Sequence, residues 1–253
     1  MAWVMGRIRV AEEFTQAVEA LTCPEELAGL LEEIAEALGF RYFALTHHVD
    51  LPRAPQPAVR IHNYPPGWAG YFDENGLGPI DPVHRASQLT SVGFTWSRLP
   101  QMIELNERDR GILDRAAREG IGEGYTVPAH VPGEAAGSCS FATATGMPVS
   151  EDLLPLAQLI GMIAFETARR MWEVRDTDTQ PRPRLTDRQR DCVFWAARGK
   201  SDWEIAKILG ISHETIIQHL KQARERYGVG KRTQLTVHAL FDGTLSFTDV
   251  ISR

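Results

Sequence analysis

The chain has 253 residues, of which 43% are hydrophobic and 24% charged, a composition typical of one or two globular domains. It holds no apolar stretch of the ~18 residues that a membrane span needs, no secretory leader and no paired cysteines, so we expect a cytoplasmic protein without a membrane partner. The net charge of -6 is distributed unevenly. Residues 1–180 hold 14 Lys and Arg against 25 Asp and Glu, whereas residues 181–253 hold 13 Lys and Arg against 8 Asp and Glu. Only the C-terminal part therefore has the positive charge that favours binding to a polyanion.

Residues 1–174 combine helical and strand periodicity. Apolar side chains recur at helical spacing from Val10 to Leu21 and from Leu27 to Leu38, which predicts two amphipathic helices. Further helices are predicted to begin near Pro65 and Asp81 and to span residues 105–119 and 151–172, and strands are predicted over 41–49, 58–61, 124–131 and 137–145. These elements predict an α/β/α sandwich in which helices pack on a mainly antiparallel sheet.

The apolar periodicity stops at residues 175–184, RDTDTQPRPR. Two prolines there remove backbone donors and prevent a helix from continuing. This stretch predicts a linker between two domains, residues 1–174 and residues 185–253. The expected fold class is therefore α+β, with the sandwich followed by an all-α domain.

Four helices are predicted in residues 185–253. Thr186, then Ser201 or Asp202, then Ser212 are placed to cap the first three helices, and a glycine follows each of them. A fourth helix fits residues 232–241. The tight connection from Gly210 to Ser212 is typical of a helix-turn-helix, whose second helix enters the major groove of duplex DNA.

The helix that follows Ser212 turns apolar side chains inward and polar side chains outward. Residues near its start can hydrogen-bond to base edges, and cations nearer its end can contact phosphates. The residues predicted to contact DNA are His213, Glu214, Thr215, Gln218, His219, Lys221, Gln222 and Arg224. A solvated helix face is the alternative that this pattern alone leaves open.

A more specific signal lies in residues 185–234. The segments LTDRQ, WAARGK, EIAKILGIS, HL and VGKRTQ, in this order, resemble the DNA-binding domain of LuxR-type regulators. The resemblance implies that residues 212–227 form the recognition helix and that the fourth helix supports dimerisation. Gln189 departs from the pattern, since the family usually carries Glu there, and this bears on a local contact.

The N-terminal domain carries a second pattern. Tyr64, Trp68, the pair Asp81-Pro82 and Trp96 follow one another at spacings of four, thirteen and fifteen residues. This spacing is similar to that of the acyl-homoserine lactone binding domain of quorum-sensing LuxR-type receptors. Considered singly, Asp81 is equally well explained as the N-cap of a helix, and the aromatic residues as ordinary core.

The stretch GIGEGYTVPAHVPGEAAGSCSFAT, residues 120–143, extends this resemblance. It is similar to the glycine-rich strand pair of the same family, and it places Gly124, Thr126 and Ser140 at matching positions. With both patterns the resemblance covers nearly the whole chain. The residues that it implies for ligand binding are Tyr64, Trp68, Phe72, Asp81, Trp96, Thr126 and Ser140.

The resemblance assigns these residues roles that make physical sense for a mostly apolar signal. Trp68 would donate its indole N–H to the lactone carbonyl, and Asp81 would accept the amide N–H. Tyr64 and Ser140 would donate to the amide carbonyl, and Trp96 would pack against the lactone ring. Each polar group of the signal would then have a partner in a buried site.

Two positions depart from the usual pattern of the domain. Phe72 stands where a tyrosine is common, and Val83 stands where some relatives supply a threonine hydroxyl. The first change keeps an aromatic wall and removes a phenol, and the second leaves the ligand amide to Asp81 alone. These changes bear on which acyl group fits, so a branched or aromatic chain stays open beside a straight one.

An enzyme that processes a lactone is an alternative from another functional class. The sequence contains no GxSxG elbow and no GxxxxGK[ST] phosphate loop. His213-Glu214 begins like an HExxH zinc motif, but Ile217 stands in place of the second histidine. We therefore expect no catalytic residue, no metal site and no cofactor besides the signal. A regulator that is ligand-independent, or that senses a non-lactone molecule, is the other alternative.

The expected function is that of a quorum-sensing transcription regulator. It would bind an acyl-homoserine lactone in its N-terminal domain and, as a homodimer, a palindromic promoter element through its C-terminal domain. The dimer is expected because one such module covers too few base pairs to be selective. Two recognition helices about 34 Å apart read two half-sites on one face of the duplex.

Overall fold

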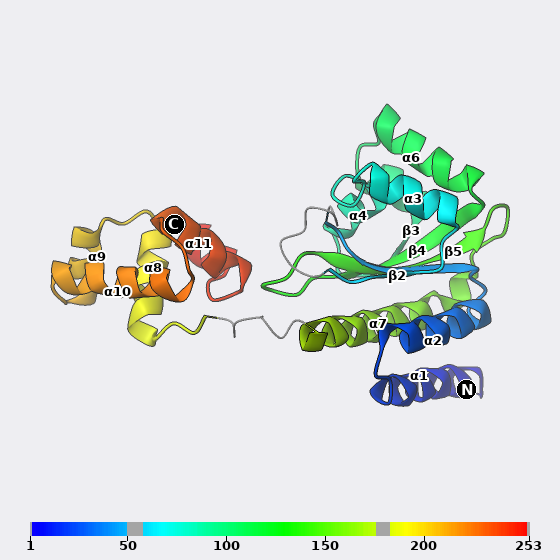
Figure 1. Cartoon of the computed structure of the whole chain (residues 1–253), viewed down its shortest axis with the longest axis horizontal. Helices are drawn as coiled ribbons and strands as arrows, with labels where there is room; N and C mark the ends of the chain where they lie inside the picture. Colours follow the sequence, from blue (N-terminus) through cyan, green and yellow to red (C-terminus); the bar gives the residue numbers. More distant parts are fainter. Residues whose placement is uncertain (1, 50–57, 176–182, 252–253) are drawn as a thin grey trace. The chain divides into compact units, whose positions relative to one another are not determined.

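A computed structural model describes residues 2–49, 58–175 and 183–251. The chain divides into two compact units, one built around a β-sheet and one built of helices (Figure 1), which confirms the expected α+β class. The stretch of residues 51–57 and most of the linker predicted at 175–184 lie outside the described residues. All three cysteines are free thiols. Among the described helices, none has the length and apolarity to cross a membrane.

The sheet of the N-terminal unit has, among the described residues, five strands in the order β2-β1-β5-β4-β3, with every neighbouring pair antiparallel. The strands are β1 (Tyr42–His47), β2 (Arg60–His62), β3 (Phe94–Thr95), β4 (Ile121–Ala129) and β5 (Gly137–Ala144). Four of them confirm strands predicted from the sequence. The prediction missed β3, because two residues are too few to show an alternating pattern.

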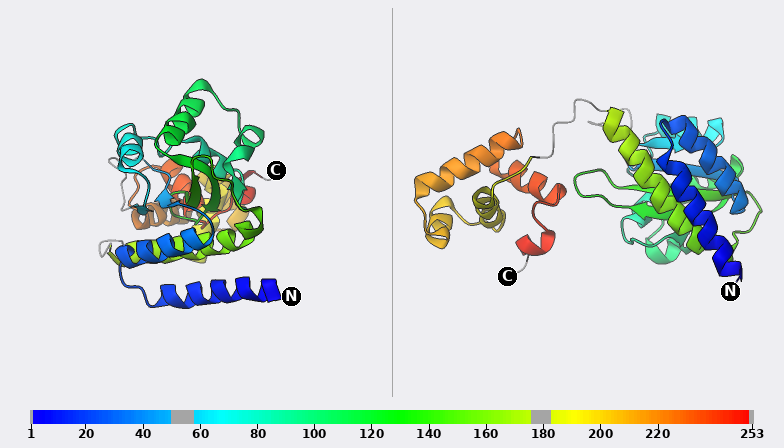
Figure 2. Two further views of the ribbon diagram at one scale, coloured as in Figure 1. Left: turned by 90° about the vertical axis from the view of Figure 1, so that its right-hand side faces the viewer. Right: turned by 90° about the horizontal axis from the view of Figure 1, so that it is seen from below.

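Two long helices, α2 (Pro24–Ala37) and α7 (Leu154–Arg175), cover one face of this sheet, and α1 (Ala2–Glu19) packs on the outer side of α7 (Figures 1 and 2). Because successive side chains of a strand point to opposite faces, Phe43 and Leu45 of β1 point the same way. Both are 0% exposed, and they join Phe141 of β5 and Ile160 of α7 in one apolar core. Burial of each such side chain contributes on the order of 2 kcal/mol, so this face holds the domain together.

Shorter elements cover the opposite face: α3 (Pro66–Glu74), α4 (Pro82–Ser87), η2 (Trp96–Arg98), α5 (Leu99–Met102) and α6 (Glu107–Arg118), while η3 (Glu151–Leu153) leads into α7. The alternate residues of the strands belong to this face, among them Ala44 and Thr46 of β1 and Ser140 of β5. These side chains are small or polar, so they leave space beneath the helices. The α/β/α layering predicted from the sequence is confirmed.

A buried carboxylate fixes two of the covering helices relative to each other. Asp109, which is 1% exposed, lies 2.8 Å from Arg85 Nη1, and this ion pair joins α6 to α4. The same carboxylate accepts the backbone N–H of Asn106 at 3.0 Å, and the Asn106 side chain accepts that of Asp109 at 2.9 Å. This capping box sets the start of α6.

The C-terminal unit contains α8 (Asp187–Ala197), α9 (Asp202–Leu209), α10 (His213–Arg226), α11 (Arg232–Phe241) and α12 (Phe247–Ile251). The N-caps Thr186, Ser201 and Ser212 are confirmed. Each side-chain oxygen accepts the backbone N–H of the third residue along, at 3.3, 3.4 and 3.1 Å respectively. The sequence did not predict α12, which has only five residues.

The helix-turn-helix is formed by α9 and α10. Gly210 ends α9 in the left-handed conformation, with φ of 67°, a value that glycine adopts without strain. Ile205 of α9 and Ile216 of α10 are both 0% exposed and pack with Leu235 of α11 in one core. The turn and this shared core hold α10 as an outer helix of the unit.

Ile216 and Ile217 are neighbours on α10 in opposite environments, at 0% and 44% exposure. We expect Ile216→Ala to lower the free energy of unfolding of the C-terminal unit by about 2–5 kcal/mol, because it leaves a cavity in the core. Ile217→Ala should change it by less than about 0.5 kcal/mol. Urea denaturation of the two full-length variants measures the difference, and equal losses would contradict the orientation of α10.

Candidate functional site

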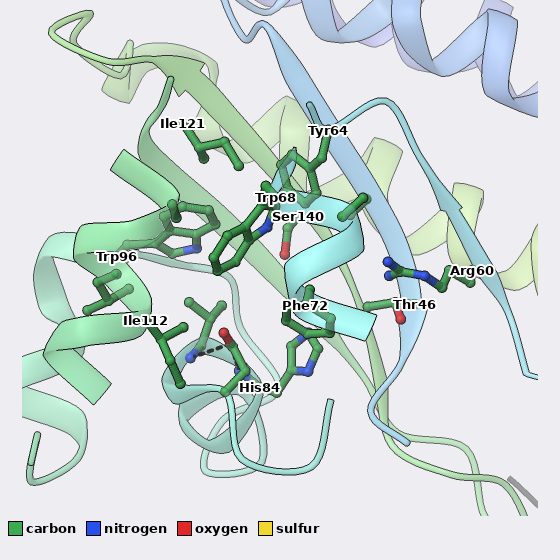
Figure 3. A pocket seen from close by; sticks show the side chains of 16 residues that line it. Thr46, Arg60, Tyr64, Trp68, Phe72, His84, Trp96, Ile112, Ile121 and Ser140 are labelled. Atoms are coloured by element: carbon green, nitrogen blue, oxygen red, sulfur yellow. Dashed lines mark hydrogen bonds between the residues drawn. The ribbon is translucent and has the colours of Figure 1, made fainter. Parts of the chain in front are cut away.

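A cavity lies between the polar face of the sheet and helices α3, α4 and α6 (Figure 3). It holds about 600 Å³ of space between atoms, counted together with the solvent at its mouth. The lining residues are Ala44, Thr46, Arg60, Tyr64, Trp68, Ala69, Phe72, Asp81, Val83, His84, Trp96, Ile112, Leu113, Ala116, Ile121 and Ser140.

Tyr64 and Trp68 bring two hydrogen-bond donors to this cavity (Figure 3). Tyr64 precedes α3, where Pro66 occupies the first turn, and Trp68 follows on the same turn with 6% of its surface exposed. Neither the Tyr64 hydroxyl nor the Trp68 indole N–H forms a hydrogen bond to a described residue. Burial raises the pKa of Tyr64 well above its ordinary value, so the phenol stays protonated and able to donate.

Asp81 caps α4, which is one of the two roles that the sequence left open for it. Its Oδ1 accepts the backbone N–H of Val83 at 2.9 Å and that of His84 at 3.1 Å. Both bonds end on Oδ1, so Oδ2 receives no hydrogen bond from a described residue. The side chain lines the cavity and is 5% exposed. The cap therefore leaves one carboxylate oxygen for a second role.

Ser140 and Trp96 are joined by Thr126, which lies behind the cavity wall. The Trp96 indole N–H donates to Thr126 Oγ1 at 2.9 Å, and this oxygen lies 2.8 Å from Ser140 Oγ. Thr126 is 0% exposed and does not line the cavity, in contrast to the other six residues predicted to bind ligand. When Thr126 donates to Ser140, the hydrogen of the Ser140 hydroxyl is left for a ligand.

Gly124 makes room for the Trp96 indole. A Cβ atom at position 124 would lie 2.3 Å from Trp96 Cε2, closer than non-bonded carbon atoms approach each other. The family resemblance of residues 120–143 includes a glycine at position 124 but does not explain it. The contact with Trp96 explains it, because only glycine leaves room for this ring against β4.

Sequence interpretation missed three polar residues of the cavity wall: Thr46, Arg60 and His84. Thr46 and Arg60 are cross-strand partners on β1 and β2. Arg60 Nη2 lies 2.8 Å from Asp73 Oδ1, and its guanidinium lies 5.6 Å from the centroid of the Phe72 ring. The alternation along β1 was a signal that could have identified Thr46, but no local pattern places Arg60 or His84.

The residues predicted to contact DNA all belong to α10 and differ in exposure. Glu214, Gln218 and Lys221 are exposed, whereas His213, Thr215, His219, Gln222 and Arg224 are half-buried. The His213 ring stacks on Trp203 of α9, with ring centroids 4.5 Å apart. Among the residues predicted to contact DNA, these three are therefore the ones that solvent or a partner reaches most freely.

Two of the half-buried residues are held by other parts of the unit. Gln189 Nε2 donates to Gln222 Oε1 at 3.1 Å, and Arg224 Nη1 donates to the Gly230 carbonyl at 2.9 Å. Gln189 Oε1 also accepts the backbone N–H of Thr186 at 3.0 Å, which completes the capping box of α8. The glutamine in place of the usual glutamate thus keeps the cap and adds a contact to α10.

A serine and a histidine meet beside the cavity without forming an accessible nucleophile. Ser138 Oγ lies 2.9 Å from His48 Nε2, but the residues are 0% and 8% exposed and neither lines the cavity. Burial, followed by the charge of His84, lowers the pKa of His48 well below its ordinary value. In the part of the chain that the structure describes, no group of three or more His, Cys, Asp or Glu side chains is placed to hold a metal ion.

Comparison with known proteins identifies both units. Residues 24–171 match the family described as "Autoinducer binding domain", and residues 183–239 match "Bacterial regulatory proteins, luxR family". The transcriptional activator protein AhyR of Aeromonas hydrophila is 28% identical over 92% of this chain and 91% of its own length. The quorum sensing-dependent transcriptional regulator RpaR of Rhodopseudomonas palustris is 30% identical over 94% of this chain and 95% of its own length.

The solved structure of Escherichia coli SdiA is similar in fold, with a TM-score of 0.69 and 23% sequence identity over 93% of this chain and 98% of that chain. The matched families and the curated relatives are transcriptional regulators and not enzymes. The chain belongs to the LuxR family, as a quorum-sensing transcription regulator with an autoinducer binding domain followed by a helix-turn-helix DNA-binding domain.

Proposed function

We propose that the N-terminal domain, residues 1–174, binds an acyl-homoserine lactone in the cavity beneath α3. One observation carries the proposal: the Tyr64 hydroxyl, the Trp68 indole N–H and Asp81 Oδ2 line the cavity without a hydrogen bond to a described residue. Once a ligand excludes water from the cavity, each of these polar groups left without a partner would cost about 1–3 kcal/mol. The site therefore favours a ligand that offers acceptors to the two donors and an N–H to the carboxylate, and an acyl-homoserine lactone has both.

Each of the six predicted residues that line the cavity then has one contact with the signal. Trp68 donates to the lactone carbonyl, and Asp81 accepts the amide N–H through Oδ2. Tyr64 and Ser140 donate to the amide carbonyl, while Trp96 packs against the lactone ring. Phe72 forms part of the apolar wall for the acyl group, and Thr126 acts by holding Trp96 and Ser140 in place.

The C-terminal domain, residues 185–253, binds duplex DNA in the same proposal. The recognition helix is α10, and a homodimer in the cytoplasm places two such helices on a palindromic promoter element. The exposed residues Glu214, Gln218 and Lys221 are the ones best placed to contact DNA in this state. Gln222 and Arg224 contact DNA only if they exchange their internal hydrogen bonds for new ones.

A non-lactone signal is a second candidate, and one observation favours it. A structure of similar fold, with a TM-score of 0.67 and 22% identity, is that of SdiA in complex with octanoyl-rac-glycerol. An acylglycerol has an ester in place of the amide, so it would offer Asp81 a glycerol hydroxyl and not an N–H. Because a hydroxyl can accept as well as donate, an acylglycerol depends less strictly on the Asp81 carboxylate than a lactone amide does.

Asp81→Asn separates the cap of α4 from the contact with the signal. Asparagine caps helices about as well as aspartate, so the unfolding free energy of the unliganded protein should change by less than about 0.5 kcal/mol. With Oδ1 held by the cap, the amide NH2 group would face the N–H of the lactone, donor against donor. We expect the affinity for an acyl-homoserine lactone to fall about 10- to 100-fold, as measured by isothermal titration calorimetry.

Glu74→Gln is the matched control, because Glu74 is an exposed acid at the end of α3 that does not line the cavity. It should leave the affinity unchanged. Trp68→Phe keeps a ring but removes the indole N–H, and it should weaken binding about 5- to 10-fold. If Asp81→Asn and Trp68→Phe both bound the lactone as tightly as the wild-type protein does, this pocket would be ruled out.

Lys221→Ala tests the DNA-binding face of α10. Lys221 is exposed, and its ion pair with Glu225, at 3.8 Å, contributes little stability. We expect the variant to bind all DNA sequences more weakly by a similar factor. The slope of log affinity against log salt concentration should become smaller in magnitude by about one, because one fewer counterion is released. Fluorescence anisotropy over a salt series, on DNA selected from a random library by the full-length protein, measures this.

Arg9→Ala is the control for this measurement. Arg9 forms a similar exposed ion pair with Glu13, at 3.0 Å, but on α1 of the N-terminal unit. Its removal should leave the salt dependence of DNA binding unchanged. An identical salt slope for wild type and Lys221→Ala would show that this part of α10 does not lie against phosphates.

A further inference from the structure

The wall of the cavity changes in character along its length. On the side of Trp96 it is made of apolar groups such as Ile112 and Ile121 (Figure 3). On the other side of Trp68 and Ser140, toward β1 and β2, the polar side chains Thr46, Arg60 and His84 surround Phe72. If the lactone ring packs on Trp96, as the proposed function has it, the acyl group runs toward these polar residues.

His84 presents an unused ring nitrogen in this region. Its Nδ1 lies 2.8 Å from the Gly78 carbonyl oxygen, and because a carbonyl only accepts, Nδ1 carries the hydrogen. Nε2 forms no hydrogen bond to a described residue, and the surrounding atoms do not seal it off. The residue is 6% exposed and lines the cavity. A hydrocarbon chain placed here would leave this nitrogen without a partner.

The ring of His84 is held in place from both sides. It stacks on His48 with centroids 3.8 Å apart and an interplanar angle of 13°, and Phe72 meets it edge-on at 5.7 Å. Burial and the neighbouring His84 keep the pKa of His48 well below its ordinary value, so the stack does not bring two cations together. With Nδ1 bound to Gly78, the direction of Nε2 is fixed before a ligand arrives.

The polar groups next to His84 do not favour a charged ligand. The Arg60 guanidinium is already neutralised by Asp73, at 2.8 Å, and Thr46 Oγ1 donates to the His47 carbonyl at 3.0 Å. A carboxylate on the acyl group would thus find no free positive charge. A hydroxyl is different, because it can donate to Nε2 of an imidazole whose hydrogen is on Nδ1.

We propose that the acyl group of the signal carries a hydroxyl that hydrogen-bonds to His84 Nε2. The inference rests on the proposed function, because it assumes that a lactone occupies the cavity. It adds the chemical class of the acyl group, which neither the departures at Phe72 and Val83 nor the family resemblance specifies. Thr46 and Arg60 surround this contact with a polar environment.

The test compares ligands that differ by one oxygen atom. Full-length protein is titrated calorimetrically with octanoyl-homoserine lactone, with its isomers hydroxylated at successive acyl carbons, and with the corresponding keto compounds. At least one hydroxylated isomer should bind about tenfold more tightly than the parent and than its keto counterpart. A keto compound that gains as much as the hydroxylated one would overturn the assignment, since a ketone cannot donate.

Variants then connect this preference to His84. In His84→Phe, the ratio of the two affinities should fall to about one, because the ring is kept and its acceptor is removed. His84→Gln, whose amide can replace both hydrogen bonds, should retain part of the preference and guards against a folding defect. Ile112→Val, in the apolar part of the cavity, should change both affinities together and leave their ratio unchanged.

The possible outcomes separate this inference from the proposed function. If no lactone binds, with or without a hydroxyl, the proposed function is wrong. If lactones bind but no hydroxylated isomer is preferred, only the inference about the acyl group is wrong. A preference that persists in His84→Phe would likewise exclude His84 as the hydroxyl partner while lactone binding stands.

Discussion

The alternation of side chains along β1 and β5 is the constraint on which both the core and the cavity depend. Phe43 and Phe141 are buried against the helices on one face, while their neighbours Ala44 and Ser140 line the cavity on the other. A shift of either strand by one residue would exchange the two sets. It would bury polar groups among apolar ones, so the driving force that folds the sheet also fixes which groups face a ligand.

Asp81 connects the cavity to the stability of the helix that covers it. A helix as short as α4, with six residues, gains little from its own hydrogen bonds and depends on its cap and its packing. The cap is Asp81, and the packing includes the ion pair of Arg85 with Asp109. Because the residue that starts α4 also lines the cavity, the position of His84 in the wall follows from the same carboxylate. Cap geometry and site geometry are therefore linked.

The sequence predicted features that depend on local contacts better than features that join distant segments. The caps Thr186 and Ser212 act on backbone groups within the same turn, so their spacing was sufficient. The family resemblance of two separate stretches, residues 64–96 and 120–143, also indicated six residues that the fold brings to one cavity. It could not place Thr126 behind the wall, because that position depends on a bond from Trp96. Nor could it orient the His84 ring toward the cavity, because the Asp81 cap fixes only the backbone of His84, and the ring is held by its stack with His48.

A ligand in the cavity would take part in the packing of the domain itself. Trp68, Ile112 and Ile121 line the cavity and also belong to the apolar cluster between the sheet and its covering helices. An occupant at a hundredfold excess over its dissociation constant would stabilise this arrangement by about 2.7 kcal/mol. A signal can shift an equilibrium only if it binds the two states differently. Burial between two layers supplies that difference, because neither layer alone can contact the apolar body of the signal and satisfy all its polar groups.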